Sequence, residues 1–162
     1  MKSRVYIETT IISYLTARHS RDLIMSAHQA LTEQWWRIHG PECELYVSGL
    51  VVSETKKGDA EACRRRAVAI EGIPLLAVTD EVSNLAKRLL RAHALPSTAE
   101  DDAIHVALAS VFEMDVLLTW NCRHIANPIT MPKIWTTILE SGYEAPAITT
   151  PSYLLESFGD MP

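Results

Sequence analysis

The chain of 162 residues has the length of one ordinary domain, and its 48% hydrophobic and 22% charged residues exclude a wholly disordered protein. Its formal net charge of −5 argues against a protein that coats nucleic acid non-specifically, because such proteins are usually basic. It does not exclude a nuclease, since metal-binding carboxylates add negative charge while basic residues gather on one rim.

Short apolar runs alternate with longer periodic stretches, and this alternation is typical of βαβ units. Residues 5–7 predict a buried strand that ends at Glu8, with a short helix directly after it. Residues 22–38 predict a helix whose core-facing stripe consists of Ile24, Ala27, Leu31, Trp35 and Ile38. Residues 45–47 predict a second strand, and Ser48 is placed to cap the helix that carries Glu54.

The middle of the chain contains further helix and strand signals. Asp59 is placed to cap a helix that runs to Ile70, and Gly72 ends it. Residues 75–78 predict a short strand, and residues 79–93 predict a helix. Residues 97–100 match a capping box, in which a hydroxyl and a carboxylate satisfy free backbone N–H groups at a helix start.

The remaining elements complete an α/β domain. Residues 116–120 give the clearest buried strand, and residues 132–141 predict a helix. The stretch from Ala145 onward predicts a short strand and a loosely packed tail. We therefore expect one domain over residues 1–145, with a mostly parallel central sheet flanked by helices, and a C-terminal tail over residues 146–162.

Nothing in the sequence suggests a membrane or secreted protein. No apolar run approaches the roughly 20 residues that span a bilayer, and the first eight residues lack the apolar stretch of a secretion signal. We expect a cytoplasmic protein without membrane contact. Its cysteines, which we expect to be reduced thiols, form no C-x-x-C pair: Cys43, Cys63 and Cys122.

Polar residues follow the predicted strands at the edge where open parallel sheets place their working residues. Glu8 directly follows the first strand, and Asn121 directly follows the strand of residues 116–120. Glu54 lies on the helix that leaves the second strand, and Asp102 lies in the first turn of the helix before the last strand. We expect these four residues to converge at one edge of the sheet.

Convergence of three carboxylates would require a positive charge among them. Two unit charges at about 4 Å repel by roughly 4 kcal/mol at an effective dielectric of 20, against a total domain stability of roughly 5–15 kcal/mol. A Mg²⁺ or Mn²⁺ ion suits such oxygen ligands. Nearby lysines or arginines, or a raised carboxyl pKa, are the other solutions.

Each residue alone also has a plainer explanation. Asp102 in a first helical turn favours the helix dipole, Glu54 can be a solvated helix acid, and Asn121 can cap the next turn through its side chain. The basic runs at residues 56–57 and 64–66 are either a rim for a phosphate backbone or a solvated helix face.

Four segments match a known family in order and spacing: residues 5–10, 46–54, 101–109 and 117–121. Through them the sequence resembles PIN domains, and among these the VapC-like toxins of toxin–antitoxin pairs. The likeness spans residues 5 to about 125. It implies a PIN-like three-layer fold.

The resemblance also assigns roles to individual positions. Glu8, Glu54 and Asp102 are similar to the family's acidic metal cluster, and Asp102 fits the spacing better than Asp101, which should be more exposed. Asn121 stands where the family more often has another aspartate, and Glu8 stands where aspartate is commoner. The implied metal ligands are Glu8, Asp102 and Asn121, with Glu54 as acceptor of a water proton.

Four residues are expected to support that site. Thr10 and Thr119 resemble hydroxyl residues that orient the ligands. Arg123 is placed to hold a phosphate, and His124 either faces the substrate or is a loop histidine bonded to backbone. His105, one turn after Asp102, either orients Asp102 or is a partly buried helix histidine.

The implied activity is Mg²⁺- or Mn²⁺-dependent hydrolysis of RNA phosphodiester bonds. The alternatives are a non-catalytic PIN-like module that binds RNA or a protein, and a metal-dependent phosphatase for small substrates. The resemblance further implies a homodimer and a small antitoxin partner. Trp36 is the possible contact for that partner, because Trp35 lies on the predicted core stripe.

Overall fold

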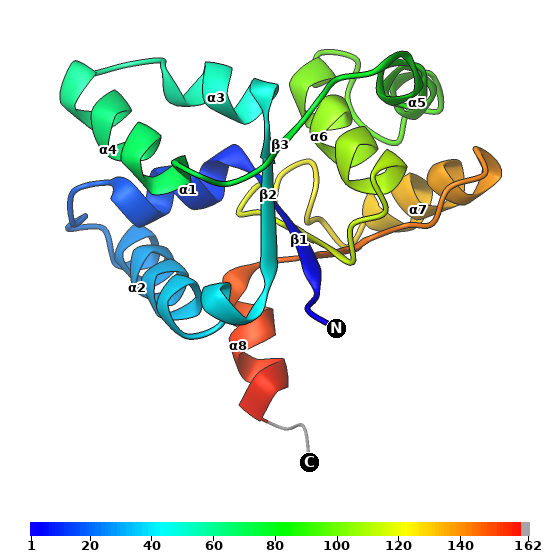
Figure 1. Cartoon of the computed structure of the whole chain (residues 1–162). Coiled ribbons are helices and arrows are strands. Elements are labelled where there is room, and N and C mark those ends of the chain that lie inside the picture. The colour runs from blue at the N-terminus through cyan, green and yellow to red at the C-terminus, as the bar shows by residue number, and fades with distance from the viewer. Residues whose placement is uncertain (160–162) are drawn as a thin grey trace.

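A five-stranded, fully parallel sheet forms the centre of the molecule in the computed structural model, which describes residues 1–159. The strand order is β3-β2-β1-β4-β5 (Figure 1). The strands are β1 (Arg4–Ile7), β2 (Glu44–Ser48), β3 (Leu75–Leu76), β4 (Val116–Leu118) and β5 (Ala147–Thr149). The predicted α/β architecture with a parallel sheet is therefore confirmed.

Helices cover both faces of this sheet. In Figure 1, α1, α2 and α4 lie on one side of the strands, and α5, α6 and α7 lie on the other. Three layers result, as expected for a chain that alternates strands and helices. The helices are α1 (Thr9–Thr16), α2 (Leu23–Ile38), α3 (Gly49–Thr55), α4 (Ala60–Ile70), α5 (Asp80–Arg91), α6 (Glu100–Val111), α7 (Met131–Glu140) and α8 (Pro151–Gly159).

The strand order reverses direction at β1. The chain runs from β1 outward to β2 and β3, and then returns to place β4 on the other side of β1. Ile7 is paired with Leu118 in register, and the backbone N–H of Glu8 donates to the carbonyl of Leu118 at 3.1 Å. Such a reversal opens a crevice at the carboxyl ends of the strands, where ligands bind in open α/β sheets.

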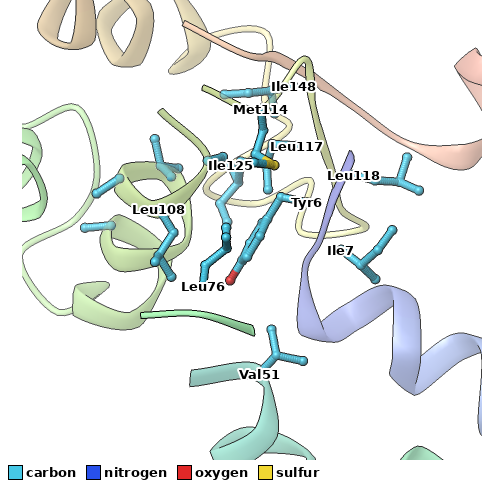
Figure 2. Packing of buried hydrophobic residues seen from close by; sticks show 14 of the residues in the cluster. Tyr6, Ile7, Val51, Leu76, Leu108, Met114, Leu117, Leu118, Ile125 and Ile148 are labelled. Carbon is cyan, nitrogen blue, oxygen red and sulfur yellow. The ribbon is translucent and has the colours of Figure 1, made fainter. Parts of the chain in front are cut away.

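The core is built from alternating side chains of the central strands. Tyr6 and Ile7 are both fully buried, and Figure 2 shows them pointing to opposite sides of β1. Tyr6 points toward Leu76 and the α6 side, whereas Ile7 lies near Leu118. This alternation is the period of two that a strand buried on both faces requires.

Helix α2 differs from its predicted orientation. Trp35 is fully buried and Trp36 is half-buried, as predicted, but Ile24 is 69% exposed and Ile38 is 44% exposed. The inward side is instead polar at Gln29 and Thr32. The Thr32 hydroxyl accepts a hydrogen bond from the Trp120 indole at 2.7 Å. This bond explains why α2 turns Thr32 to the core in place of the predicted apolar residues.

The predicted capping box at residues 97–100 was wrong. Helix α6 begins at Glu100, and Ala99 occupies the N-cap without a side-chain hydrogen bond. The backbone N–H of Ala99 donates to the carbonyl of Pro96 at 2.9 Å, so residues 96–99 form a turn. Because of this turn the N-cap position falls on Ala99, so the hydroxyl of Ser97 does not cap the helix.

The two predicted strands at residues 75–78 and 116–120 are shorter than expected. β3 covers only Leu75–Leu76 and β4 ends at Leu118. After Leu118 the backbone N–H of Trp120 donates to the Thr10 hydroxyl at 2.8 Å, which turns the chain away from the sheet and toward α1.

The C-terminal segment adds ordered structure to the sheet. β5 pairs with β4 as the predicted short strand. The part after it is a helix, α8, which contacts α2 where a loose tail was expected. Residues 160–162 of the predicted tail lie outside the described residues.

No helix among residues 1–159 combines the length and apolar character that a membrane crossing needs. The three cysteines are all free thiols.

Candidate active site

A pocket of about 380 Å³ opens between the end of α3 and the start of α6. Glu54 from α3 and Asp102 from α6 line it together with His124 from the loop after β4. Its full lining is Glu54, Thr98, Ala99, Glu100, Asp101, Asp102 and His124. The sequence prediction that Asp101 is the more exposed of the two neighbouring aspartates is confirmed.

Glu8 lies buried at the carboxyl end of β1, with 4% of its surface exposed. It is the N-cap of α1, and its Oε2 accepts a hydrogen bond from the backbone N–H of Thr10 at 3.1 Å. The same oxygen accepts from the hydroxyl of Thr10 and from that of Thr119, the latter at 2.7 Å. Both threonines predicted to support the site therefore contact this carboxylate.

Glu54 is held through one of its two carboxylate oxygens. Its Oε2 accepts hydrogen bonds from the hydroxyl of Thr9 and from Nε2 of His105, the latter at 3.0 Å. Burial alone would raise the pKa of Glu54, but the hydrogen bond and charge of His105, the Thr9 hydroxyl and the charge of Lys57 lower it. Glu54 is therefore a carboxylate at neutral pH.

His105 occupies the centre of the site and is 1% exposed. Its Nδ1 lies 2.7 Å from the hydroxyl of Tyr6, which lies 2.8 Å from the hydroxyl of Ser48. Ser48 is the N-cap of α3, as predicted. Burial lowers the pKa of His105, but the hydrogen bond to Glu54 and the charges of Glu8, Glu54 and Asp102 outweigh it and raise this pKa.

These charges show how the three predicted acids are arranged. Glu8 Oε1 lies 3.9 Å from Nε2 of His105, Glu54 Oε2 lies 3.0 Å from it, and Asp102 is close enough to raise its pKa. Glu8 and Glu54 therefore flank one imidazole, and Asp102 lines the neighbouring pocket together with Glu54. The expectation that His105 orients Asp102 is corrected, because its ring nitrogens bond Glu54 and Tyr6.

Asp102 is oriented by a different histidine. Its Oδ2 lies 2.8 Å from Nδ1 of His124, and both side chains are partly exposed, at 21% and 26%. The backbone N–H of His124 donates to the side-chain oxygen of Asn121 at 3.0 Å. Asn121 thus caps the turn after β4, the plainer of its two predicted uses, and Arg123 on the same loop is exposed.

The donor set suits a hard divalent cation at the acids but not at the histidine. Ligand atoms of Glu8, Glu54 and His105 lie within 4.8 Å of one another, the spacing of groups that share an ion. A hydrogen bond from Nε2 of His105 to a carboxylate places a proton on that nitrogen, so it has no lone pair for a metal. Carboxylate oxygens are the ligands that Mg²⁺ and Mn²⁺ prefer.

Sequence reasoning missed three contributors to this site: Tyr6, Thr9 and the central position of His105. The available signal was His105 itself, a titratable residue three positions after Asp102 on an otherwise apolar helix stretch. A buried tyrosine in a strand gives no such signal, because aromatic residues are common in strands for packing alone.

Comparisons with known proteins bear on the fold. No family model and no curated protein matches this chain. Among solved structures, a chain of VapBC2 from Rickettsia felis, determined bound to a DNA fragment from its promoter, superimposes with a TM-score of 0.61 at 12% identity. The match covers 91% of this chain and 98% of the other.

A second solved structure has the same fold. VapC20 of Mycobacterium tuberculosis, a toxin that cleaves the sarcin–ricin loop, matches with a TM-score of 0.56 at 14% identity, over 74% of this chain and 92% of the other. The PIN-like fold that the sequence predicted is therefore confirmed.

Proposed function

We propose that this chain, which has the fold of VapC toxins, is a metal-dependent ribonuclease that hydrolyses RNA phosphodiester bonds. The observation that carries the proposal is the convergence of Glu8 and Glu54 on one buried imidazole, beside an acidic pocket that Glu54 lines together with Asp102. The fold likeness supports the choice of substrate, because VapC20 of the same fold is a sarcin–ricin loop cleaving toxin.

We propose Mg²⁺ or Mn²⁺ as the cofactor, held by Glu8, Glu54 and Asp102, with Asn121 at the edge of the site. Such an ion lowers the pKa of a bound water and neutralises negative charge on the phosphate. The free oxygen of Glu54 would help to hold the ion, and Glu54 is the acid that would accept a proton from the attacking water. We propose that the phosphate contacts His124, which lines the pocket and is held by Asp102, and the exposed Arg123 next to it in the chain.

The test compares cleavage of structured RNAs, a sarcin–ricin stem-loop among them, by the wild type and by Asp102→Asn. Removal of Asp102 should reduce cleavage at least about 100-fold, the scale of a lost catalytic group, and chelation of divalent ions should abolish it. Asp80→Asn, which changes an exposed aspartate at the start of α5 outside the pocket lining, is the matched control and should cleave within a few-fold of wild type. Equal cleavage by wild type and Asp102→Asn rejects the proposal.

One observation favours a second function, a PIN-like module that binds without cutting. The raised pKa of His105 favours the charged imidazolium, whose charge would offset those of Glu8 and Glu54 and let the two acids lie close together without a metal. Calorimetric titration with Mn²⁺ separates the two functions. A bound ion supports the nuclease, and its absence supports the module.

We also propose that the protein is cytoplasmic, forms a homodimer and is inhibited by a small antitoxin. The half-buried Trp36, packed edge-to-face on Trp35, is a candidate contact, because aromatic side chains are favoured in interfaces. Size-exclusion chromatography with light scattering measures the dimer. Co-purification with the product of a neighbouring small gene measures the antitoxin, and Trp36→Ala should weaken that complex.

A further inference from the structure

We infer that His105 is a positioning residue: it holds Glu54 so that this acid, like the two beside it, presents a single oxygen to the cation. This inference rests on the proposed cation site and deepens it. It assigns His105 a role other than ligand, although its Nε2 lies close enough to Glu8 and Glu54 to share an ion with them.

The three acids share one pattern. In each carboxylate, protein donors occupy one oxygen: Oε2 of Glu8 by Thr10 and Thr119, Oε2 of Glu54 by Thr9 and His105, and Oδ2 of Asp102 by His124. The second oxygen of each acid takes no hydrogen bond within residues 1–159. Each acid therefore has one fixed oxygen and one oxygen left for a ligand.

The direction of the His105 hydrogen bond does not depend on the charge of the ring. A carboxylate only accepts, so the contact of 3.0 Å from Nε2 to Glu54 Oε2 requires the proton on Nε2. Nδ1 then either accepts from the Tyr6 hydroxyl as neutral imidazole or donates to it as imidazolium. In both states Nε2 is a donor, and it is not a metal ligand.

The ring has little freedom to take another orientation. His105 is 1% exposed, and Tyr6 at Nδ1 is itself fully buried and bonded to Ser48 at 2.8 Å. Ser48 in turn accepts from the backbone N–H of Val51 in α3, the helix that carries Glu54. This series of contacts connects β1, α3 and α6 and fixes the imidazole relative to the acid it holds.

Carboxylates that can bind an ion through only one oxygen favour some cations over others. Mg²⁺ and Mn²⁺ accept carboxylates through one oxygen in near-octahedral geometry, whereas Ca²⁺ takes more oxygens and commonly binds a carboxylate through both. Holding Glu54 Oε2 away from the ion should therefore favour the smaller cations. Loss of His105 leaves only the Thr9 hydroxyl on that oxygen, which is then held less firmly, so the preference should weaken.

The experiment measures Mn²⁺ and Ca²⁺ affinity by calorimetry for wild type, His105→Gln and His105→Leu. Glutamine retains an N–H donor at about the reach of Nε2, and leucine removes it. The matched control is Ser110→Ala, which removes a buried hydroxyl on the same helix that donates to the carbonyl of Val106. Circular dichroism and thermal melting establish that each variant is folded.

The expected result is a fall of about 10-fold or more in Mn²⁺ affinity for His105→Leu, the usual effect of removing a group that orients a metal ligand. Ca²⁺ affinity should fall less, so the ratio of the two affinities should drop. His105→Gln should recover most of the Mn²⁺ affinity, and Ser110→Ala should equal wild type. A general loss of packing would not change the ratio of the affinities or be reversed by glutamine.

A second measurement locates the proton of His105 first without metal and then with it. Nitrogen-15 spectra of the metal-free protein should show the proton on Nε2 of His105, and it should remain there when Mg²⁺ is added. Displacement of that proton by Mg²⁺ would make His105 a ligand and overturn the inference. So would equal Mn²⁺ affinity in wild type and His105→Leu. If wild type binds no divalent ion at all, the proposed cofactor fails, and the inference fails with it.

Discussion

At the scale of single residues, the site depends on donors that replace the water lost by buried carboxylates. Glu8 is 4% exposed, and each donor to its Oε2 offsets part of the cost of its burial. Thr119→Val keeps the shape of the side chain but removes one donor. It should lower the free energy of unfolding by about 1.5–3 kcal/mol, the net contribution of a hydrogen bond to a charged group, as measured by urea denaturation.

The matched control is Thr137→Val. Thr137 is also buried, but its hydroxyl donates to the carbonyl of Lys133 in its own helix, which keeps other partners. Its loss should cost clearly less. Equal costs for the two substitutions would show that the hydroxyl of Thr119 is ordinary packing and not part of a carboxylate site.

The pH dependence of stability follows from Glu54 and His105. The pKa of His105 is raised in the folded protein, so its stabilisation is complete below its unfolded pKa of about 6.5 and is lost as the pH rises through the folded pKa. The pKa of Glu54 is lowered, so its stabilisation is present above its ordinary value of about 4.3 and is lost as the pH falls through the lowered value.

Metal-free protein should therefore melt at lower temperature as the pH rises above about 6.5. The His105→Gln variant lacks the titrating ring, so the decline should be smaller in it. Differential scanning calorimetry between pH 6 and pH 9 in the presence of a chelator compares the two proteins. Parallel curves would show that His105 is not charged in the folded state.

The residue scale also shows what the sequence can and cannot reveal about the site. Glu8 and Asn121 come soon after apolar strands and Glu54 lies on the helix that leaves β2, so their place at one sheet edge follows from the parallel topology. The partner of His105 does not follow from spacing. Asp102 is its neighbour one turn away on α6, but the acid that faces the ring is Glu54, 51 positions distant on α3.

At the scale of elements, the end of α3 and the start of α4 carry basic residues, one of them near the acidic pocket. Lys56, Lys57 and Arg64 are exposed, and the charge of Lys57 is close enough to lower the pKa of Glu54. Arg65 and Arg66, in contrast, are occupied with backbone carbonyls. The first three cations are therefore available to a phosphate backbone, and Lys57 is the one that lies near the acidic pocket.

If the protein binds RNA, these three cations should contribute to the salt dependence of binding. Each neutralised phosphate on a single strand adds about 0.7 to the slope of log affinity against log salt. The combined variant Lys56→Gln, Lys57→Gln, Arg64→Gln should reduce that slope by up to about 2. Fluorescence anisotropy with the Asp102→Asn protein measures binding without cleavage.

A control with the same change in charge is Arg88→Gln, Arg91→Gln, Lys133→Gln. These exposed cations lie on α5 and α7, on the other side of the sheet (Figure 1). Their removal should leave the slope almost unchanged. Equal losses in both variants would mean that RNA responds to net charge and not to the first three cations.

Elements with strong local signals could be predicted, and those set by tertiary contacts could not. Asp59 and Thr79 cap their helices as expected, because the cap needs only a side chain and its own helix. The polar inner face of α2 depends on the indole of Trp120, 88 positions from Thr32. The missing cap of α6 depends on the turn that Pro96 begins.

At the scale of the whole molecule, β5 connects the C-terminal segment to the site. Ile148 is 6% exposed and packs in the core, and the backbone N–H of Ala147 donates to the carbonyl of Asp115 at 2.9 Å. The carbonyl of Thr149 accepts from the backbone N–H of Thr119 at 3.0 Å. The hydroxyl of Thr119 donates to Glu8, so β5 stabilises the position of this acid through the backbone of Thr119.

Two truncations test whether the domain ends at residue 145, the boundary that the sequence suggested. A chain of residues 1–150 keeps β5 and loses α8 with its contacts to α2, so it should fold with reduced stability and retain Mn²⁺ binding. A chain of residues 1–145 also loses β5. Burial of Ile148 alone is worth about 1.5–3 kcal/mol, and β4 becomes an unpaired edge, which favours aggregation.

The shorter chain should therefore lose cooperative unfolding in urea or bind Mn²⁺ at least about 10-fold more weakly than residues 1–150, because Thr119 is no longer held. Cooperative unfolding and unchanged Mn²⁺ affinity in residues 1–145 would show that the boundary at 145 is sound and that β5 is dispensable. Comparison of the two truncations with each other removes the effect of α8, so the difference between them isolates the edge strand and its hydrogen bond to Thr119.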